Sequence, residues 1–191
     1  MILLIDLCYR EDSLGFDEYV LPVARIVERL GFRTRSVHFH AVSAGECSGV
    51  KAVILCGTPL ADNAFLDEPE DFSWLKTSRI PVLGVCAGME TICRIFGGKL
   101  EPCIEIGMTE IRVTGRDPLF PESHSFSAYE LHTLACTDPG PMKIIAVSDR
   151  CIQVVRHPTK PVYGVMFHPE VRNEWAVERF LSMTRKDGIS P

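Results

Sequence analysis

The segment GVCAGME, residues 84–90, places one cysteine between two glycines where an apolar run ends. The run before it predicts a buried strand, and the residues after it predict a short helix. A side chain at such a sharp turn faces the free N–H groups of the helix, which favour a thiolate over a thiol. Gly84 and Gly88 lack the Cβ atoms that would crowd this junction. Cys86 is therefore a candidate nucleophile, and a buried cysteine at a packing corner is the alternative interpretation.

A second group of reactive side chains lies in GVMFHPEV, residues 164–171. Proline favours an extended conformation for the preceding residue, and in an extended chain residues two apart point to the same side. Glu170 can therefore orient one nitrogen of His168 while the other nitrogen faces a thiol. A plain His-Pro-Glu turn is the alternative. The remaining histidines are expected to be surface or structural residues: His38, His40, His124, His132 and His157.

The elements that must position these side chains alternate between strands and helices. Strands are expected at 1–9, 34–42, 51–57 and 81–86, and helices at 17–30 and 88–96. The second half predicts successive strands at 108–115, 125–135, 142–149, 151–158 and 161–168, followed by a helix at 173–186. This order predicts one α/β domain over residues 1–191, with an open, mostly parallel sheet flanked by helices in three layers and a small antiparallel β portion. Ligands of such sheets bind at the carboxyl ends of the strands.

Composition excludes several classes of function. The formal charge of −5, without a run rich in lysine or arginine, gives no electrostatic case for binding nucleic acid. The apolar opening reaches Asp6 too soon for a membrane span or a secretory leader. The eight cysteines include no CxxC pair and no zinc-ligand spacing. We therefore expect a cytoplasmic protein with mostly structural thiols, no metal and no cofactor.

Three motifs occur in order along the chain: VILCGTP at 53–59, GVCAGME at 84–90 and GVMFHPEV at 164–171. With these motifs the sequence resembles the class I, triad-type glutamine amidotransferase domains, over nearly the whole chain. They resemble that family's oxyanion loop, nucleophile elbow and His/Glu strand. The segments GGKLEP and EIGMTEIRV also fall where family members carry similar residues. The layout is most similar to stand-alone amidotransferase subunits of the GMP synthetase kind, and the family's fold is flavodoxin-like.

The resemblance implies hydrolysis of the glutamine side-chain amide. Cys86 would attack the amide carbon, His168 would assist proton transfer, and Glu170 would orient His168. The backbone N–H groups of Gly57 and Ala87 match the family's oxyanion donors. The expected partners are glutamine, or a related small amide, and a separate synthetase subunit that receives the ammonia.

The substrate pocket departs from the family pattern at several positions. Thr58 stands where the family has a second glycine, and Glu90 stands where glutamine is common. Met166 likewise replaces a common glutamine before the histidine. The loop that binds the glutamine backbone has no clean equivalent, and Ser127 and Tyr129 are the candidate substitutes. The sequence therefore predicts the reaction class more firmly than the substrate.

Other functions remain open at this stage. The same three side chains suit a cysteine hydrolase of another γ-glutamyl or amide substrate. A catalytically weak regulatory binding subunit would keep the residues without turnover. Related α/β cysteine proteins, which include stress chaperones and redox sensors, explain Cys86 but give no role to His168 and Glu170.

Overall fold

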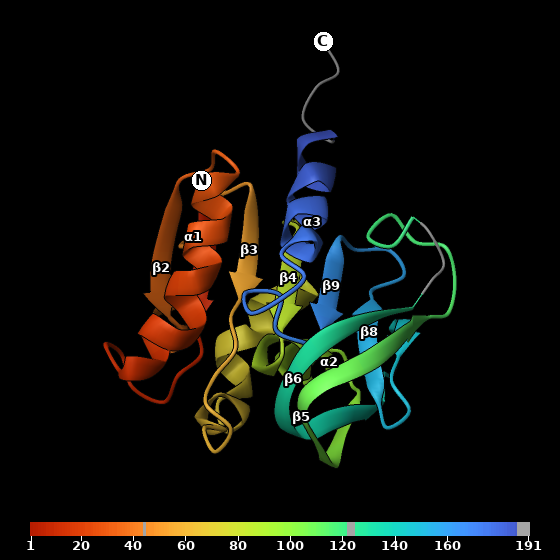
Figure 1. The fold of residues 1–191 in the computed structure, drawn as a ribbon. Helices are drawn as coiled ribbons and strands as arrows, with labels where there is room; N and C mark the ends of the chain where they lie inside the picture. The colour runs from red at the N-terminus through yellow and green to blue at the C-terminus, as the bar shows by residue number, and fades with distance from the viewer. Residues whose placement is uncertain (44, 122–124, 187–191) are drawn as a thin grey trace.

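The computed structural model describes residues 1–43, 45–121 and 125–186. Within these ranges nine strands form one sheet in the order β2-β1-β3-β4-β9-β8-β7-β5-β6 (Figure 1). The strands are Ile2–Asp6 (β1), Thr34–His38 (β2), Ala52–Leu55 (β3), Val82–Val85 (β4), Lys99–Val113 (β5), Ser125–Asp138 (β6), Lys143–Val147 (β7), Ile152–Arg156 (β8) and Val162–Val165 (β9). The neighbouring pairs from β2 to β9 are parallel, and those from β9 to β6 are antiparallel.

The parallel half is the buried centre of the molecule. Every residue of β1, β3, β4 and β9 is buried, because helices cover both faces of a parallel sheet. The helices α1 (Leu21–Arg29) and α3 (Trp175–Lys186) contact each other on one face, while α2 (Ala87–Ile95) packs on β4 and β9 from the other (Figure 1). The predicted α/β class with flanking helices is confirmed.

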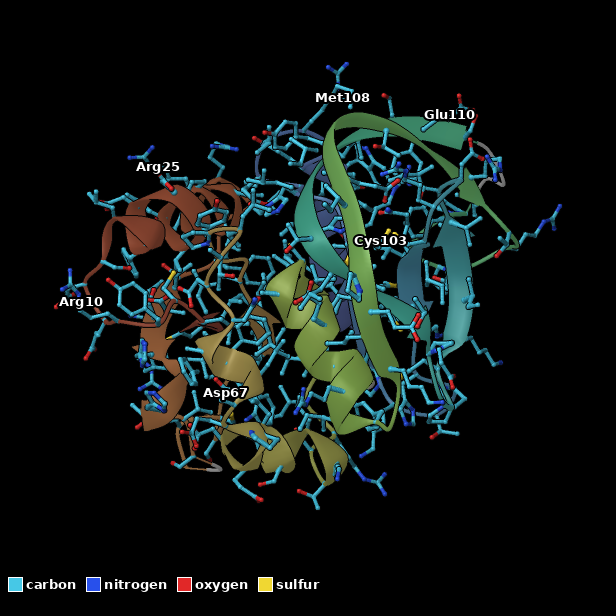
Figure 2. All side chains as sticks on the ribbon, turned by 90° about the horizontal axis from the view of Figure 1, so that it is seen from below. Arg10, Arg25, Asp67, Cys103, Met108 and Glu110 are labelled. Carbon is cyan, nitrogen blue, oxygen red and sulfur yellow. The ribbon has the colours of Figure 1, made fainter. Side chains whose placement is uncertain are left out.

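The antiparallel half is larger than the small portion expected. The strands β5 and β6 form a long curved ribbon, seen in Figure 2, where Cys103, Met108 and Glu110 mark the course of β5. Along much of β5, exposed residues alternate with more buried ones, as expected for a strand with one face packed on the protein. Ile104, Ile106 and Met108 are its exposed apolar side chains.

Local differences from the expected elements are few. The helix predicted at 17–30 begins as a π-helix over Phe16–Val20 and continues as α1. The strand predicted at 34–42 ends at His38, and Phe39–Ala41 form a 3₁₀ turn, so His40 lies outside the strand. Two further 3₁₀ segments, Ala64–Leu66 and Pro69–Lys76, connect β3 to β4. None of the helices in the described ranges is both long and apolar enough to span a bilayer. The expectation of one domain over residues 1–191 stays a prediction.

Two glycines allow the close packing where β4 turns into α2. A Cβ atom on Gly84 would lie 2.4 Å from the backbone carbonyl of Gly88. A Cβ atom on Gly88 would lie 2.4 Å from the carbonyl oxygen of Leu55 in β3. Because these neighbours are backbone atoms, no side-chain rotation can make room. The helix α2 can therefore begin directly on the sheet only with glycine at both positions.

The substitution Gly88→Ala tests this packing. We expect it to lower the free energy of unfolding by about 1–3 kcal/mol, because the added methyl group must push α2 away from β3. Thermal unfolding followed by circular dichroism measures the change. Gly115→Ala is the matched control, since a Cβ atom there meets none of the described atoms within 4 Å. Equal melting temperatures for the two variants would contradict the packing argument.

Candidate active site

Cys86 is held in a strained backbone conformation between a strand and a helix. Its φ is 49° and its ψ is −106°, values that non-glycine residues rarely adopt. Its N–H donates to Val165 O at 2.8 Å, which continues the β4–β9 pairing, and its carbonyl accepts from Glu90 N at 3.0 Å, which begins α2. These bonds fix both sides of the turn and hold the side chain at the carboxyl end of β4.

His168 and Glu170 follow β9, the strand that pairs with β4. His168 Nδ1 lies 2.7 Å from Glu170 Oε1, and both side chains are almost fully buried. The backbone N–H of His168 donates to Tyr129 O at 2.9 Å, which ties this segment to β6. The hydrogen bond from Nδ1 leaves Nε2 as the nitrogen that can accept a proton.

Cys86 and His168 interact electrostatically in this site. Burial raises the pKa of the Cys86 thiol, and the nearby His168 imidazole partly opposes this rise. Burial alone would lower the pKa of His168, but the Cys86 sulfur and Glu170 outweigh it and hold the pKa well above its ordinary value. The thiol itself donates to Leu131 O at 3.7 Å, and His168 Nε2 has no hydrogen-bond partner among the described residues. The thiol therefore donates to the backbone of β6 in this structure and leaves His168 Nε2 open.

The loop after β3 lies against the imidazole. A Cβ atom on Gly57 would lie 3.0 Å from His168 Cε1 and 3.2 Å from the Tyr19 ring, so this position favours glycine. Thr58 is buried, and its hydroxyl donates to Asp62 O at 3.0 Å. The threonine therefore stabilises one conformation of the loop through this bond, in addition to the steric effect of its Cβ atom.

A small pocket lies beside Cys86. Its lining consists of the loop after β3, the start of α2 and part of β6: Thr58, Pro59, Leu60, Asn63, Cys86, Ala87, Glu90, Leu131, His132, Thr133 and Leu134. The free volume is about 10 Å³, which is room for about one water molecule. The pocket in this conformation is therefore too small for an amino-acid substrate, and the β6 segment or the loop must move to admit one.

The structure brings most of the predicted site residues together. Thr58, Ala87 and Glu90 line the pocket with Cys86. Tyr129 places its ring 6.4 Å from that of His168, centroid to centroid. Ser127 lies farther along β6, opposite Glu110 on β5, and is not among the residues that line the pocket.

One pocket residue is not among the predicted site residues. The sequence gives no reason to place His132 at the site, yet it is 2% exposed and lies between the carboxylates of Glu105 and Glu130. The signal that could have found it is the spacing of Glu130 and His132, two apart on one strand and thus on one face. His124 lies outside the described residues.

Comparison with known proteins identifies the family. Residues 16–184 match the model of the family described as glutamine amidotransferase class-I. The chain belongs to this family. One relative, from Methanothrix thermoacetophila, is a subunit of a glutamine-hydrolysing GMP synthase and is 36% identical over 122 residues, which are 59% of this chain and 67% of that protein. The corresponding protein of Archaeoglobus fulgidus is 28% identical over 87% of this chain and 91% of that protein.

Solved structures of known proteins share this fold. A protein from Thermoplasma acidophilum, assigned to the same class of GMP synthase subunits, superposes with a TM-score of 0.84 at 22% identity, over 97% of this chain and 94% of its own. A glutamine amidotransferase from Thermotoga maritima superposes with a TM-score of 0.68 at 18% identity, over 100% and 86%. The match to the GMP synthase of Petrotoga mobilis spans only 26% of that longer protein. As a member of this amidotransferase family, the chain is a cysteine-dependent amide hydrolase.

Among the residues that line the pocket, Glu90 carries a carboxyl group with a raised pKa. It is 4% exposed, and burial raises its pKa to about 7, although His132 and His168 oppose the rise. The side chain is therefore partly protonated at neutral pH. A neutral carboxylic acid resembles the carboxamide of glutamine in shape and in its ability to donate a hydrogen bond.

The substitution His168→Gln tests the coupling between imidazole and thiol. We expect alkylation of Cys86 by iodoacetamide at pH 7 to slow at least about tenfold, because loss of the imidazole raises the thiol pKa and lowers the thiolate fraction. Mass spectrometry of the Cys86 peptide over a pH series measures the rate. His40→Gln is the control, since His40 is half-exposed and pairs with Asp71. An unchanged pH profile in His168→Gln would refute the coupling.

Proposed function

We propose that the chain hydrolyses the side-chain amide of glutamine at Cys86 and supplies the ammonia to a synthetase partner of the GMP synthetase kind. The observation that carries this proposal is the arrangement of Cys86, His168 and Glu170 at one edge of the sheet. His168 and Glu170 are linked by a 2.7 Å hydrogen bond, and His168 interacts electrostatically with the Cys86 sulfur. Chaperones and redox sensors need only the cysteine, so they leave this bond without a role.

In the first half of the reaction, the Cys86 sulfur forms a bond to the amide carbon. His168 Nε2 accepts the thiol proton, and Glu170 stabilises the imidazolium that forms. The backbone N–H groups of Gly57 and Ala87 are proposed to bind the oxyanion, since developing negative charge needs fixed donors. When the C–N bond breaks, His168 returns the proton to the leaving nitrogen, which departs as ammonia.

In the second half, water attacks the carbonyl carbon of the γ-glutamyl thioester. His168 accepts one proton of the water and returns it to the Cys86 sulfur as the C–S bond breaks. Glutamate leaves, and the thiol is restored. The net reaction consumes glutamine and water and yields glutamate and ammonia, so His168 alternates between base and acid without net change.

The small size of the pocket supports a role for the partner. The pocket beside Cys86 has free volume for about one water molecule. Either the loop after β3 or the β6 segment must therefore move before glutamine can enter. Docking of a synthetase partner is a source of binding energy for such an opening. We also infer a cytoplasmic location, which the eight free cysteines support, because free thiols persist in reducing compartments.

Labelling with diazo-oxo-norleucine tests the nucleophile and the substrate class. This electrophilic glutamine analogue should add to the Cys86 sulfur with loss of dinitrogen, and excess glutamine should prevent the addition. Mass spectrometry of the intact chain and of its peptides identifies the modified residue, and Cys86→Ser is the control that should remain unlabelled. A label on another cysteine, or one that glutamine does not suppress, would count against the proposal.

The charge of Glu90 makes glutamine binding depend on pH. Above pH 7 the deprotonated carboxylate repels the substrate's own carboxylate, so we expect KM for glutamine to rise several-fold between pH 6 and pH 8. In Glu90→Gln the KM should stay, across this range, near the value that the wild-type protein shows at low pH. Steady-state release of ammonia measures both. If the two proteins show the same pH dependence of KM, Glu90 does not influence recognition.

A further inference from the structure

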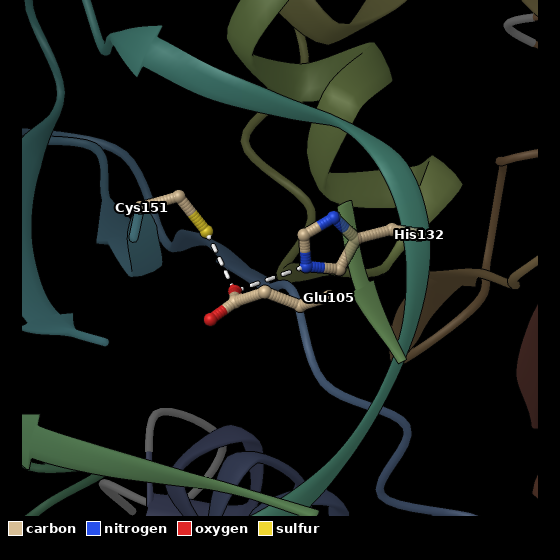
Figure 3. A group of neighbouring side chains, drawn as sticks. All are labelled: Glu105, His132 and Cys151. Atoms are coloured by element: carbon tan, nitrogen blue, oxygen red, sulfur yellow. Dashed lines mark hydrogen bonds and ion pairs between the residues drawn. The ribbon is translucent and has the colours of Figure 1, made fainter. Parts of the chain in front are cut away.

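A second group of reactive side chains lies on the antiparallel part of the sheet (Figure 3). Glu105 comes from β5, His132 from β6, and Cys151 from the turn between β7 and β8. One ligand atom from each lies within 4.8 Å of the other two. Glu105 and His132 are also direct partners across the β5–β6 pairing. The fold thus brings a sulfur, a nitrogen and an oxygen from three segments to one point.

The distances between these atoms suit a tetrahedral metal ion. His132 Nε2 lies 3.3 Å from Glu105 Oε2 and 3.4 Å from Glu130 Oε2. Glu105 Oε2 lies 3.1 Å from Cys151 Sγ. With Zn–N and Zn–O bonds of about 2.1 Å and Zn–S of about 2.3 Å, the edges of a zinc tetrahedron measure about 3.4–3.6 Å. The His132–Glu105 and Glu105–Cys151 distances therefore match two edges of this tetrahedron to within about half an ångström. The third distance, between His132 Nε2 and Cys151 Sγ, is at most 4.8 Å.

The protein orients the imidazole as a metal ligand. His132 Nδ1 lies 3.1 Å from the carbonyl oxygen of Cys103, which can only accept a hydrogen bond. The proton of the neutral ring is therefore on Nδ1, and Nε2 directs its lone pair toward the two carboxylates. Nε2 has no hydrogen-bond partner among the described residues. A backbone carbonyl at the distal nitrogen is the usual way in which proteins orient ligating histidines.

An independent observation is the burial of Glu130. Its side chain has no exposed surface, and neither of its oxygens has a hydrogen-bond partner in the described part of the chain. A buried carboxylate without partners is costly unless a cation neutralises it. One oxygen lies at the edge of the group, 3.4 Å from His132 Nε2. A divalent cation held by the neighbouring Glu105, His132 and Cys151 would balance this buried negative charge.

Gln153 on β8 donates hydrogen bonds to two of the ligand atoms. It is fully buried, and its side-chain amide donates to Glu105 Oε2 at 2.8 Å and to Cys151 Sγ at 3.3 Å. The amide thus holds these two atoms as acceptors, the role they have as metal ligands. Cys151 is only partly buried, between exposed Arg150 and the strand β8. The turn therefore offers a path by which an ion can enter.

We propose that Glu105, His132 and Cys151 bind a structural zinc ion, whose charge the buried carboxylate of Glu130 beside them helps to balance. Thiolate and imidazole ligands favour Zn²⁺ over Mg²⁺ or Ca²⁺, which prefer oxygen ligands. In the metal-free protein the thiol donates to Glu105, and zinc binding releases this proton to solvent as the sulfur becomes a thiolate. No spacing motif in the sequence indicates the site, because its ligands come from β5, from β6 and from the turn between β7 and β8. The site is distinct from the catalytic residues and does not depend on the proposed function.

The position of this site links it to the nucleophile. Glu130 and His132 flank Leu131, whose carbonyl oxygen accepts from the Cys86 thiol at 3.7 Å. Zinc would fix this segment of β6 to β5 and to the β7–β8 turn. Its role would therefore be to hold one wall of the pocket, while the substrate enters by movement elsewhere.

Zinc binding by the full chain tests the proposal. Cys86 and His168 also offer a sulfur and a nitrogen, so Cys86→Ser serves as the parent protein for all measurements. It is purified without a metal-affinity step, stripped with a chelator and titrated with Zn²⁺ against a zinc-binding dye. We expect one tight equivalent. Adding Gln153→Ala should weaken binding by about 10–100-fold, adding Cys151→Ser should weaken it further, and adding Cys47→Ser, a buried cysteine elsewhere, should leave it unchanged.

Substitution with Co²⁺ reports on the ligands directly, through the absorption spectrum of the bound ion. The parent protein should show a sulfur-to-cobalt charge-transfer band and the intense visible bands of tetrahedral cobalt. Adding Cys151→Ser should remove the charge-transfer band. If the parent protein binds no metal, or if Cys151→Ser leaves zinc affinity and the cobalt spectrum intact, the proposal is wrong. In that case the group is only an imidazolium ion held between two carboxylates.

Discussion

The sharp turn at Cys86 is the constraint on which the site depends. A positive φ at a residue with a side chain costs on the order of 1–3 kcal/mol, so the surrounding packing must impose it. Here the backbone pairs with β9 on one side of the turn and enters α2 on the other. The two glycines at positions 84 and 88 let the helix lie directly on the sheet. The position of the sulfur is thus set by the packing of the core, and the free-energy cost of the turn is met by the burial of β4 and α2.

The register of two parallel strands brings the base to the nucleophile. Val85 and Val165 are partners across β4 and β9. Cys86 lies one residue beyond this pair, and His168 lies three residues beyond it. Parallel strands end at the same edge of the sheet, so both side chains emerge there although 82 positions separate them in the numbering. A shift of one residue in this register would turn one of the strands over and separate the imidazole from the sulfur.

The sequence predicted the parts of this site that short segments encode. The apolar runs of the parallel strands, the glycines around Cys86 and the spacing of His168 and Glu170 are all local signals. The spacing of Glu130 and His132 is also local, but the environment of His132 forms only when β6 pairs with β5 and places His132 opposite Glu105. Cys151 joins the group only through the β7–β8 turn. The antiparallel ribbon was likewise underestimated, since its strands are partly exposed and their pairing depends on contacts far apart in the sequence.

The departure at Glu90 has a smaller electrostatic effect than its charge suggests. The first turn of a helix favours an anionic side chain there, because the macrodipole places partial positive charge at that end. Burial of the Glu90 carboxyl group opposes its ionisation. The effect of burial is the larger one, because the pKa rises to about 7. Near neutral pH a large fraction of the molecules therefore carry a neutral acid at the position where the family commonly has glutamine. A single proton on Glu90 then determines whether the pocket wall presents a hydrogen-bond donor or a negative charge to the substrate.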